Sequence, residues 1–175
     1  MAHNNAWSNL RLHRAVAVLD DGAYRATTRT SFFPSIHLTL VHILIVDQYY
    51  VDALAGGGRG AAVWADEPGL EHDATRASLR DAQRDVDRRL IALTDALTAT
   101  ALDDTIELER RDHVQRERRG DVLLHLFQHQ IHHRGQAHAM RAGTASAPPQ
   151  LDEFFMSEEL PLRADDLREL GLPQR

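Results

Sequence analysis

The sequence of 175 residues contains no cysteine, and none of its 20 permanently basic side chains is a lysine. Without cysteine the chain has no thiol nucleophile, thiolate zinc site, iron–sulfur ligand or disulfide. Without lysine it has no Schiff-base amine and no phosphate-loop lysine. Its chemistry must therefore rest on carboxylate, hydroxyl, guanidinium and imidazole groups, and the chain has 11 histidines.

Positive charge is also in short supply, because 20 arginines face 26 acidic residues and give a net charge of −6. This balance disfavours duplex nucleic acid as a partner, since phosphate binding needs a basic surface. The one basic cluster, residues 110–119, also contains Asp112 and Glu117. We interpret it as a solvated connection of mixed charge and predict no nucleic-acid partner.

The chain has no long uninterrupted hydrophobic run. A signal peptide would need an apolar stretch near the start, where Arg11 and Arg14 stand instead. The most apolar region, residues 32–46, is too short to span a bilayer and is interrupted by Pro34, His37 and His42. We therefore expect a cytoplasmic protein without a membrane partner.

Apolar residues at helical spacing dominate the rest of the chain. The predicted main helices cover residues 5–20, 35–55, 72–98 and 121–142, with Asp121 as the cap of the last. Residues 56–70 are predicted as a loop, 105–109 as a short extended piece and 163–170 as a short helix. The helix at 35–55 is apolar all round and should be central. These features predict one all-α domain over residues 1–175, a four-helix bundle with a short C-terminal helix.

Histidines are concentrated in the last main helix, where residues 125–138 hold five of the 11. His129 and His133 are one turn apart and share a face with apolar residues such as Leu126 and Met140. Both imidazoles should therefore point into the protein. Because two buried imidazoles side by side are costly without partners, a shared divalent cation is a good explanation for the pair.

A third ligand is expected from the helix at 35–55, where His42 stands among apolar residues. His37 lies on a different face of that helix. His125 remains a possible fourth ligand at this point, whereas His132 and His138 favour positions in solvent or behind the ligands. A cluster of hydrogen-bonded core histidines with no metal is the alternative interpretation.

Several catalytic motifs are missing. A zincin protease needs H-E-x-x-H, but Gln130 follows His129. The sequence contains no G-x-S-x-G for a serine hydrolase. The glycines at 56–58 have neither the lysine nor the strand context of a phosphate loop. No catalytic residue is assigned, and no organic cofactor is predicted.

Four segments, in order along the chain, carry a family resemblance. Residues 129–136, HQIHHRGQ, resemble the H-x-x-H-H-R-G-Q signature of the DinB family of DinB/YfiT-like metalloenzymes. Residues 35–47 resemble its second-helix pattern, and residues 5–9 and 148–155 resemble its opening and C-terminal segments. Ser8 and Val41 depart from the usual residues, but neither is a ligand position.

The resemblance implies an up-down-down-up four-helix bundle that is often a homodimer. It also implies a divalent metal held by His42, His129 and His133, which leaves His125 out. Three imidazoles suit zinc or nickel, and also iron or copper. We take zinc or nickel as the prediction. Some members of the family are transferases or isomerases that use a low-molecular-weight thiol, which this cysteine-free chain would have to take as a cosubstrate.

Besides a cluster of core histidines that binds no metal, two functional hypotheses remain open. The first is a metal-dependent enzyme acting on a small molecule, either a hydrolase or a thiol-dependent transferase or isomerase. The second is a metal-binding protein without catalysis, such as a stress-response or interaction protein. Tyr49 and Gln136 lie near the predicted metal faces and are candidates to support the ligands or line a pocket. Arg134 either orients the helix, binds a carboxylate, or forms a surface or capping salt bridge.

Overall fold

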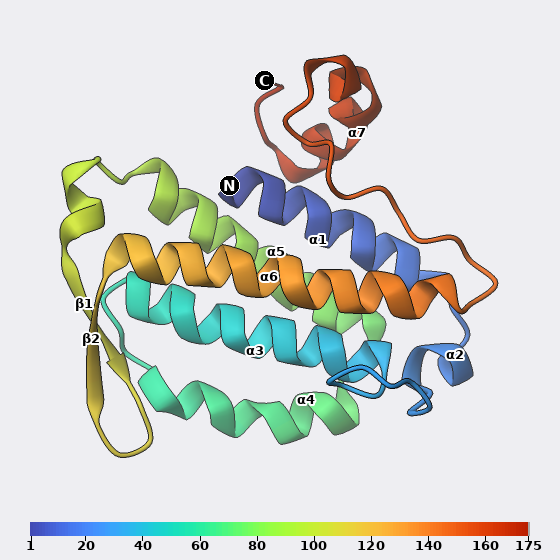
Figure 1. The fold of residues 1–175 in the computed structure, drawn as a ribbon, viewed down its shortest axis with the longest axis horizontal. Helices are drawn as coiled ribbons and strands as arrows, with labels where there is room; N and C mark the ends of the chain where they lie inside the picture. The colour runs from blue at the N-terminus through green and yellow to red at the C-terminus, as the bar shows by residue number, and fades with distance from the viewer. Residues whose placement is uncertain (175) are drawn as a thin grey trace.

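The computed structural model describes residues 1–174 and is mostly helical, with one small antiparallel sheet (Figure 1). The four long helices are α1 (Ala2–Ala17), α3 (Ile36–Leu54), α5 (Arg76–Asp95) and α6 (Arg119–Ala142). The shorter helical elements are α2 (Asp21–Arg25), η1 (Gly60–Asp66), α4 (Glu67–Asp73), η2 (Thr100–Asp103), η3 (Ser157–Glu159) and α7 (Leu160–Leu170). The strands are β1 (Thr105–Glu109) and β2 (Val114–Arg118).

Helix α3 is the central element, as its apolar circumference predicted. The Ser35 side chain caps it by accepting a hydrogen bond from the backbone N–H of Leu38 at 3.1 Å. It packs against α5, α6, η1 and α4, and Val41 and Ile45 are completely buried. Beyond its end, Gly56 adopts φ +106°, a conformation that glycine takes without steric cost. The most apolar helix therefore holds its side chains, His42 included, inside the protein.

Helices α5 and α6 lie between α1 and α3. Both α1 and α3 pack against α5 and against α6, and Figure 1 shows the four running side by side. Helix α7 docks on α1, where Trp7 Nε1 donates to Asp166 Oδ2 at 3.1 Å and Arg11 Nε to the same oxygen at 2.7 Å. Segments from both ends of the chain thus meet on one side of the protein.

The predicted loop at 56–70 is wrong in its second half. Residues from Gly60 onward form η1 and α4, and both pack on α3. Val63 is fully buried there. Pro68, which suggested a loop, stands in the first turn of α4, where a proline does not interrupt helical hydrogen bonds. Contact with the apolar surface of α3 outweighs the local glycine and proline signals.

The extended piece predicted at 105–109 is strand β1, which pairs with β2 in a hairpin. The sequence did not reveal β2, because it lies within the arginine cluster that we interpreted as a connection. Its charges are paired: Arg116 contacts Glu107 at 2.8 Å and Arg119 contacts Asp104 at 3.2 Å. The segment is of mixed charge, as expected, although it is a regular strand followed by a helix.

The helix boundaries differ from the prediction by a few residues. Helix α6 begins at Arg119, so Asp121 lies in its first turn and is not its cap. The backbone N–H of Arg119 instead donates to the carbonyl of Asp104 at 2.8 Å, which ties the helix start to the hairpin. Its end at Ala142 is as predicted. Within residues 1–174, no helix combines the length and the apolar character needed to cross a bilayer.

Candidate metal centre

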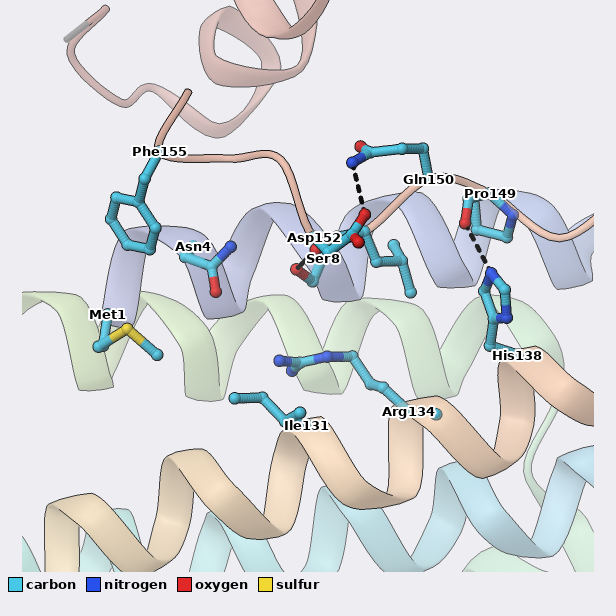
Figure 2. Close-up of a pocket in the computed structure, with 12 residues that line it drawn as sticks. Met1, Asn4, Ser8, Ile131, Arg134, His138, Pro149, Gln150, Asp152 and Phe155 are labelled. Atoms are coloured by element: carbon cyan, nitrogen blue, oxygen red, sulfur yellow. Dashed lines mark hydrogen bonds between the residues drawn. The ribbon is translucent and has the colours of Figure 1, made fainter. Parts of the chain in front are cut away.

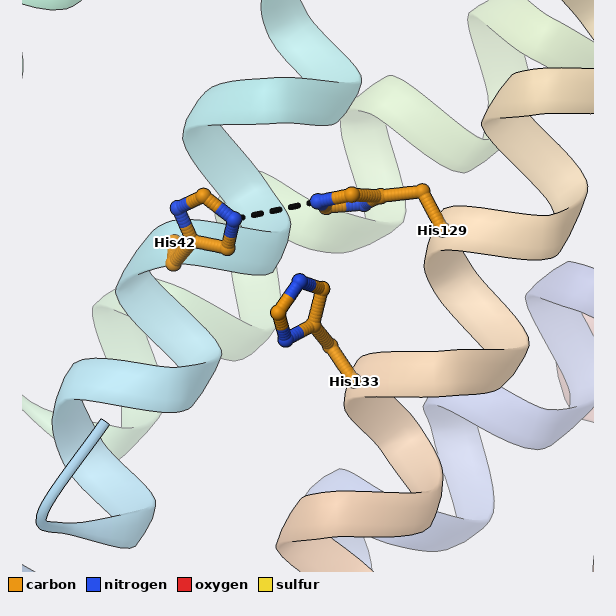
Figure 3. Close-up of side chains that lie close together, drawn as sticks. All are labelled: His42, His129 and His133. Atoms are coloured by element: carbon orange, nitrogen blue, oxygen red, sulfur yellow. Dashed lines mark hydrogen bonds between the residues drawn. The ribbon is translucent and has the colours of Figure 1, made fainter. Parts of the chain in front are cut away.

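Three histidines from two helices meet between α3 and α6. Figure 3 shows His42 on α3 facing His129 and His133, which stand one turn apart on α6. One ring nitrogen from each lies within 4.8 Å of the others. The Nε2 atoms of His42 and His129 are 3.0 Å apart. The structure therefore brings together the three histidines that the sequence singled out.

The convergence follows from local sequence. The four-residue spacing of His129 and His133 places both on one face of α6, and α6 packs along α3. His42 lies in the middle of α3, so the packing of the two helices carries it to that face. His133 is buried, and His42 and His129 are half-buried.

A neighbouring oxygen atom orients one of the three rings, and a carboxylate lies near a second. Gln136 Oε1 lies 2.8 Å from His133 Nδ1 and can accept its N–H. Glu67 Oε1 lies 4.0 Å from His42 Nδ1, on the side of the ring opposite the cluster. An acceptor at Nδ1 favours the tautomer whose Nε2 carries a lone pair, which is the form that binds a metal. His129 Nδ1 is buried and makes no hydrogen bond among residues 1–174.

Electrostatics keep the cluster uncharged. Burial, followed by the proximity of His133, lowers the pKa of His42 to about 4. Burial is the main cause that lowers the pKa of His129 to about 3. The nearby imidazoles of His133, His42, His125 and His132 lower it further. Burial also lowers the pKa of His133. Neutral imidazoles are the protonation state that ligates metals, so no proton has to leave at neutral pH.

Two further residues at the cluster were missed by sequence reasoning. The Phe33 ring lies against His42, with ring centroids 4.4 Å apart, and 5.7 Å from the centroid of His133. Glu67 falls in the segment that we had predicted as a loop. Phe33 comes directly before Pro34 and the start of α3, so its position near the helix entrance was a signal that the sequence offered.

The remaining histidines do not join the cluster. The ring centroid of His125 is 6.2 Å from that of His129, and the ring packs on Tyr50 instead. His132 is exposed and contacts Gln136. His138 contacts the carbonyl of Pro149 at 2.9 Å. His37 is buried elsewhere, 2.8 Å from the carbonyl of Glu71.

Two candidate supporting residues have other roles. The Tyr49 hydroxyl donates to the carbonyl of Glu109 at 2.6 Å, so it ties α3 to the hairpin. Arg134 is only 5% exposed and makes no surface or capping salt bridge with any residue from 1 to 174. Its Nη1 donates to the side-chain oxygens of Asn9 at 3.0 Å and Gln130 at 2.9 Å, and also to that of Asn5.

Arg134 belongs to a buried polar network that draws on all four long helices. On α1, Asn5 and Asn9 accept hydrogen bonds from Arg134. They donate their own side-chain N–H groups to Asp87 on α5, at 3.2 and 2.9 Å. Gln83 on α5 donates to Asp47 on α3 at 2.7 Å. Burial raises the pKa of Asp47 to about 7 and that of Asp87 to about 6. This network is the second group of titratable side chains inside the protein.

The geometry of the three histidines fits a divalent metal. Two nitrogens about 2.0–2.1 Å from a tetrahedral zinc lie about 3.3 Å apart, close to the separation of the two facing Nε2 atoms. Those two nitrogens point at each other across 3.0 Å, and the buried Nδ1 of His129 has no hydrogen-bond partner in the described part of the chain. Three neutral nitrogen donors suit zinc, nickel, copper or iron. The residues present are therefore compatible with metal binding.

Fold and site define a mostly helical protein in which three histidines meet between two long helices. The model of the DinB family matches residues 1–161, and the chain belongs to this family. A solved structure of a DinB-like protein from Bacillus cereus ATCC 10987 is similar, with a TM-score of 0.58 and 16% sequence identity. The match covers 82% of this chain and 90% of that one, and it concerns the fold alone. No curated protein matches the chain significantly.

Proposed function

We propose that the protein is a metal-dependent enzyme, either a hydrolase or a thiol-dependent transferase or isomerase, with His42, His129 and His133 as ligands of a divalent metal. The observation that supports this most strongly is the convergence of three neutral imidazoles within 4.8 Å. Three protein ligands leave a coordination position for substrate, which is typical of catalytic and not of structural zinc sites. Zinc or nickel is the proposed ion.

The bound metal would supply a Lewis acid that polarises a carbonyl or activates a water or thiol at neutral pH. The chain's own residues hold the ligands for this task. Gln136 keeps the proton of His133 on Nδ1, and the carboxylate of Glu67 lies 4.0 Å from Nδ1 of His42. The Phe33 ring packs against His42 and lies near His133, so it covers part of the cluster. A thiol, where used, must come from a cosubstrate, because the chain has no cysteine.

The remaining parts of the proposal concern the whole protein. The four long helices would form a single up-down-down-up four-helix bundle over residues 1–175, with a short C-terminal helix. The packing of both α1 and α3 against α5 and α6 supports this arrangement. A homodimer, a small-molecule substrate and a cytoplasmic location, all expected from the sequence, stay predictions.

Metal analysis of the purified protein tests the site. We expect about one equivalent of zinc or nickel after reconstitution of the wild type, and loss of tight binding in His42→Ala and His133→Ala. The matched control is His125→Ala, because this histidine is on the same helix but outside the group of three. Less than a tenth of an equivalent in the wild type, or unchanged binding in both ligand variants, would refute the assignment.

Activity assays separate an enzyme from a non-catalytic metal protein. Metal-loaded protein is offered a panel of ester hydrolysis and thiol conjugation reactions, with and without a low-molecular-weight thiol. Activity that disappears on chelation, returns with metal and is absent in His133→Ala supports the enzyme. A metal-loaded protein inactive across the panel favours the non-catalytic alternative.

A further inference from the structure

A cavity lies on the side of α6 opposite His129 and His133. It has a volume of about 460 Å³ and is enclosed by α1, α6 and the segment 149–155. Figure 2 shows Asn4 and Ser8 from α1 above it, Ile131 and Arg134 from α6 below it, and Phe155 at one end. Its volume is in the range of small-molecule sites.

Arg134 brings an incompletely used guanidinium to this cavity. The side chain is 5% exposed and forms no ion pair with a carboxylate within residues 1–174, although Asp47 and Asp87 lie close enough to oppose the lowering of its pKa by burial. Its Nη1 carries all of its hydrogen bonds, to Asn5, Asn9 and Gln130. A guanidinium has five N–H donors. The Nε and Nη2 atoms therefore offer one complete edge with no partner in the described part of the chain.

That free edge has the geometry that a carboxylate matches best. Two parallel N–H groups of arginine bind the two oxygens of a carboxylate together. The Nη1 side is fixed by three amide oxygens, so the guanidinium is already oriented and little freedom is lost on binding. A buried and oriented arginine with an unused edge is a built site and differs from a mobile surface arginine.

A glycine beside Arg134 keeps the cavity open. Gly135 lines the cavity in the middle of the 24-residue helix α6, and a Cβ at this position would meet no atom within 4 Å. Glycine inside a helix costs roughly 0.5–1 kcal/mol relative to alanine. Nothing in the described part of the chain packs so closely on Gly135 that a glycine is required, so a side chain here would take up part of the cavity that Arg134 also lines.

The remaining lining decides the class of ligand. The lining includes two exposed apolar side chains, Ile131 at 53% and Phe155 at 64%, together with Leu151. Asp152 stands at the rim, where its Oδ1 accepts an N–H from Gln150 at 2.7 Å. One cation with a nearby carboxylate disfavours a phosphate or a polyanion. A single carboxylate attached to an apolar body fits both the guanidinium and the apolar wall.

We propose that this cavity binds a small organic monocarboxylate, whose carboxylate pairs with the Nε–Nη2 edge of Arg134 and whose apolar body covers Ile131 and Phe155. The site is separate from the metal centre. His133 and Arg134 are consecutive on α6, and consecutive helical residues point about 100° apart. The inference does not depend on the proposed catalytic function.

Calorimetric titration of the metal-free full chain with 3-phenylpropanoate tests the proposal. The protein is kept metal-free because a carboxylate is also able to ligate a metal ion. We expect saturable one-to-one binding, and about tenfold or weaker binding of the uncharged 3-phenylpropanamide, which cannot form the charge-assisted pair. Equal affinities for the acid and the amide, or no saturation by about 10 mM acid, would overturn the proposal.

Substitutions place the binding in the cavity. Gly135→Leu adds a side chain at a position that lines the cavity and where a Cβ meets no atom within 4 Å, and we expect it to weaken 3-phenylpropanoate binding at least about tenfold. Gly69→Leu is the matched control, since Gly69 on α4 also has no neighbour within 4 Å and lies outside the cavity. Arg134→Gln should abolish the preference for the acid, but it also alters the buried network. The Gly135→Leu result therefore decides: unchanged affinity in that variant refutes this location.

Discussion

The two faces of α6 carry different kinds of buried polar group, although His133 and Arg134 are adjacent in the sequence. On one face, His133 joins His42 and His129, three groups of the same kind whose pKa values are all lowered, and the nearest carboxylate is Glu67, 4.0 Å from His42. On the other face, Arg134 joins amides and carboxylates, in which donors and acceptors alternate. The network finds its main partners within the chain. The histidine cluster instead presents neutral nitrogen donors, which can bind an external cation.

Burial perturbs both regions in the direction of the neutral form. It raises the pKa of Asp47 to about 7 and that of Asp87 to about 6. It lowers the pKa of His42 to about 4 and that of His129 to about 3. Because both regions contain strongly shifted groups, a shifted pKa alone does not identify a functional site. The arrangement of lone pairs around a common point distinguishes the histidines from the network.

The largest expected effect contrasts the regions through metal binding. A metal at about 1,000 times its Kd stabilises the folded protein by about 4 kcal/mol, which corresponds to a rise in Tm of about 8–16 °C for a chain of this size. Thermal unfolding with and without zinc or nickel measures the shift. We expect it in the wild type and in Asp87→Asn, and not in His129→Ala. A shift that survives His129→Ala would place the ion elsewhere.

The next effect concerns the network alone. Replacing Asp87 by alanine leaves the N–H groups of Asn5, Asn9 and Gln83 without their shared acceptor. Buried groups that lose a charged partner typically cost about 3 kcal/mol or more. Urea unfolding of metal-free protein should show this loss for Asp87→Ala, with Asp85→Ala on the exposed face of α5 as the control. Equal midpoints for the two variants would mean that the network contributes no stability.

Periodicity predicted the four long helices, because each has a continuous apolar stripe that packs against its neighbours. It failed for α4 and β2, where tertiary contact decides the local structure. The glycines and proline of residues 56–70 indicate a loop, yet packing on α3 orders η1 and α4. Strand β2 has charged residues on its exposed face, and only its pairing with β1 makes it extended.

Helical spacing also predicted which histidines meet, since a four-residue interval and a central apolar helix define two facing surfaces. The network was not predicted, although a signal existed. Gln83 and Asp87 lie on the same stripe as Leu79 and Leu90, so two polar side chains interrupt an apolar face. Their partners come from other helices, and sequence spacing carries no information on how α1 and α3 are placed relative to α5.

Support of the ligands from behind gives a smaller expected effect. Gln136→Ala removes the acceptor that holds the His133 proton on Nδ1. Loss of such a contact typically weakens metal binding about 10–100-fold. Competition with a chromophoric chelator measures this change. Gln130→Ala, which alters the network on the same helix, is the contrasting variant, and a comparable loss of affinity there would show that the two faces of α6 are coupled.

The smallest effect is a difference in the sign of pH dependence. The pKa of Asp87 is raised on folding, so the folded state binds the proton more tightly and stability is lost as pH rises from about 4 through about 6. The pKa of His129 is lowered, so stability is lost as pH falls below about 6.5. As the pH rises from 5 to 7, the titration of Asp87 should therefore lower the free energy of unfolding of the wild type by about 1 kcal/mol. Asp87→Asn should not show this loss. His129→Gln should lose less stability than the wild type on acidification over the same range. Urea unfolding of the metal-free proteins at several pH values measures both, and slopes of the same sign for the two variants relative to the wild type would contradict the contrast between the faces.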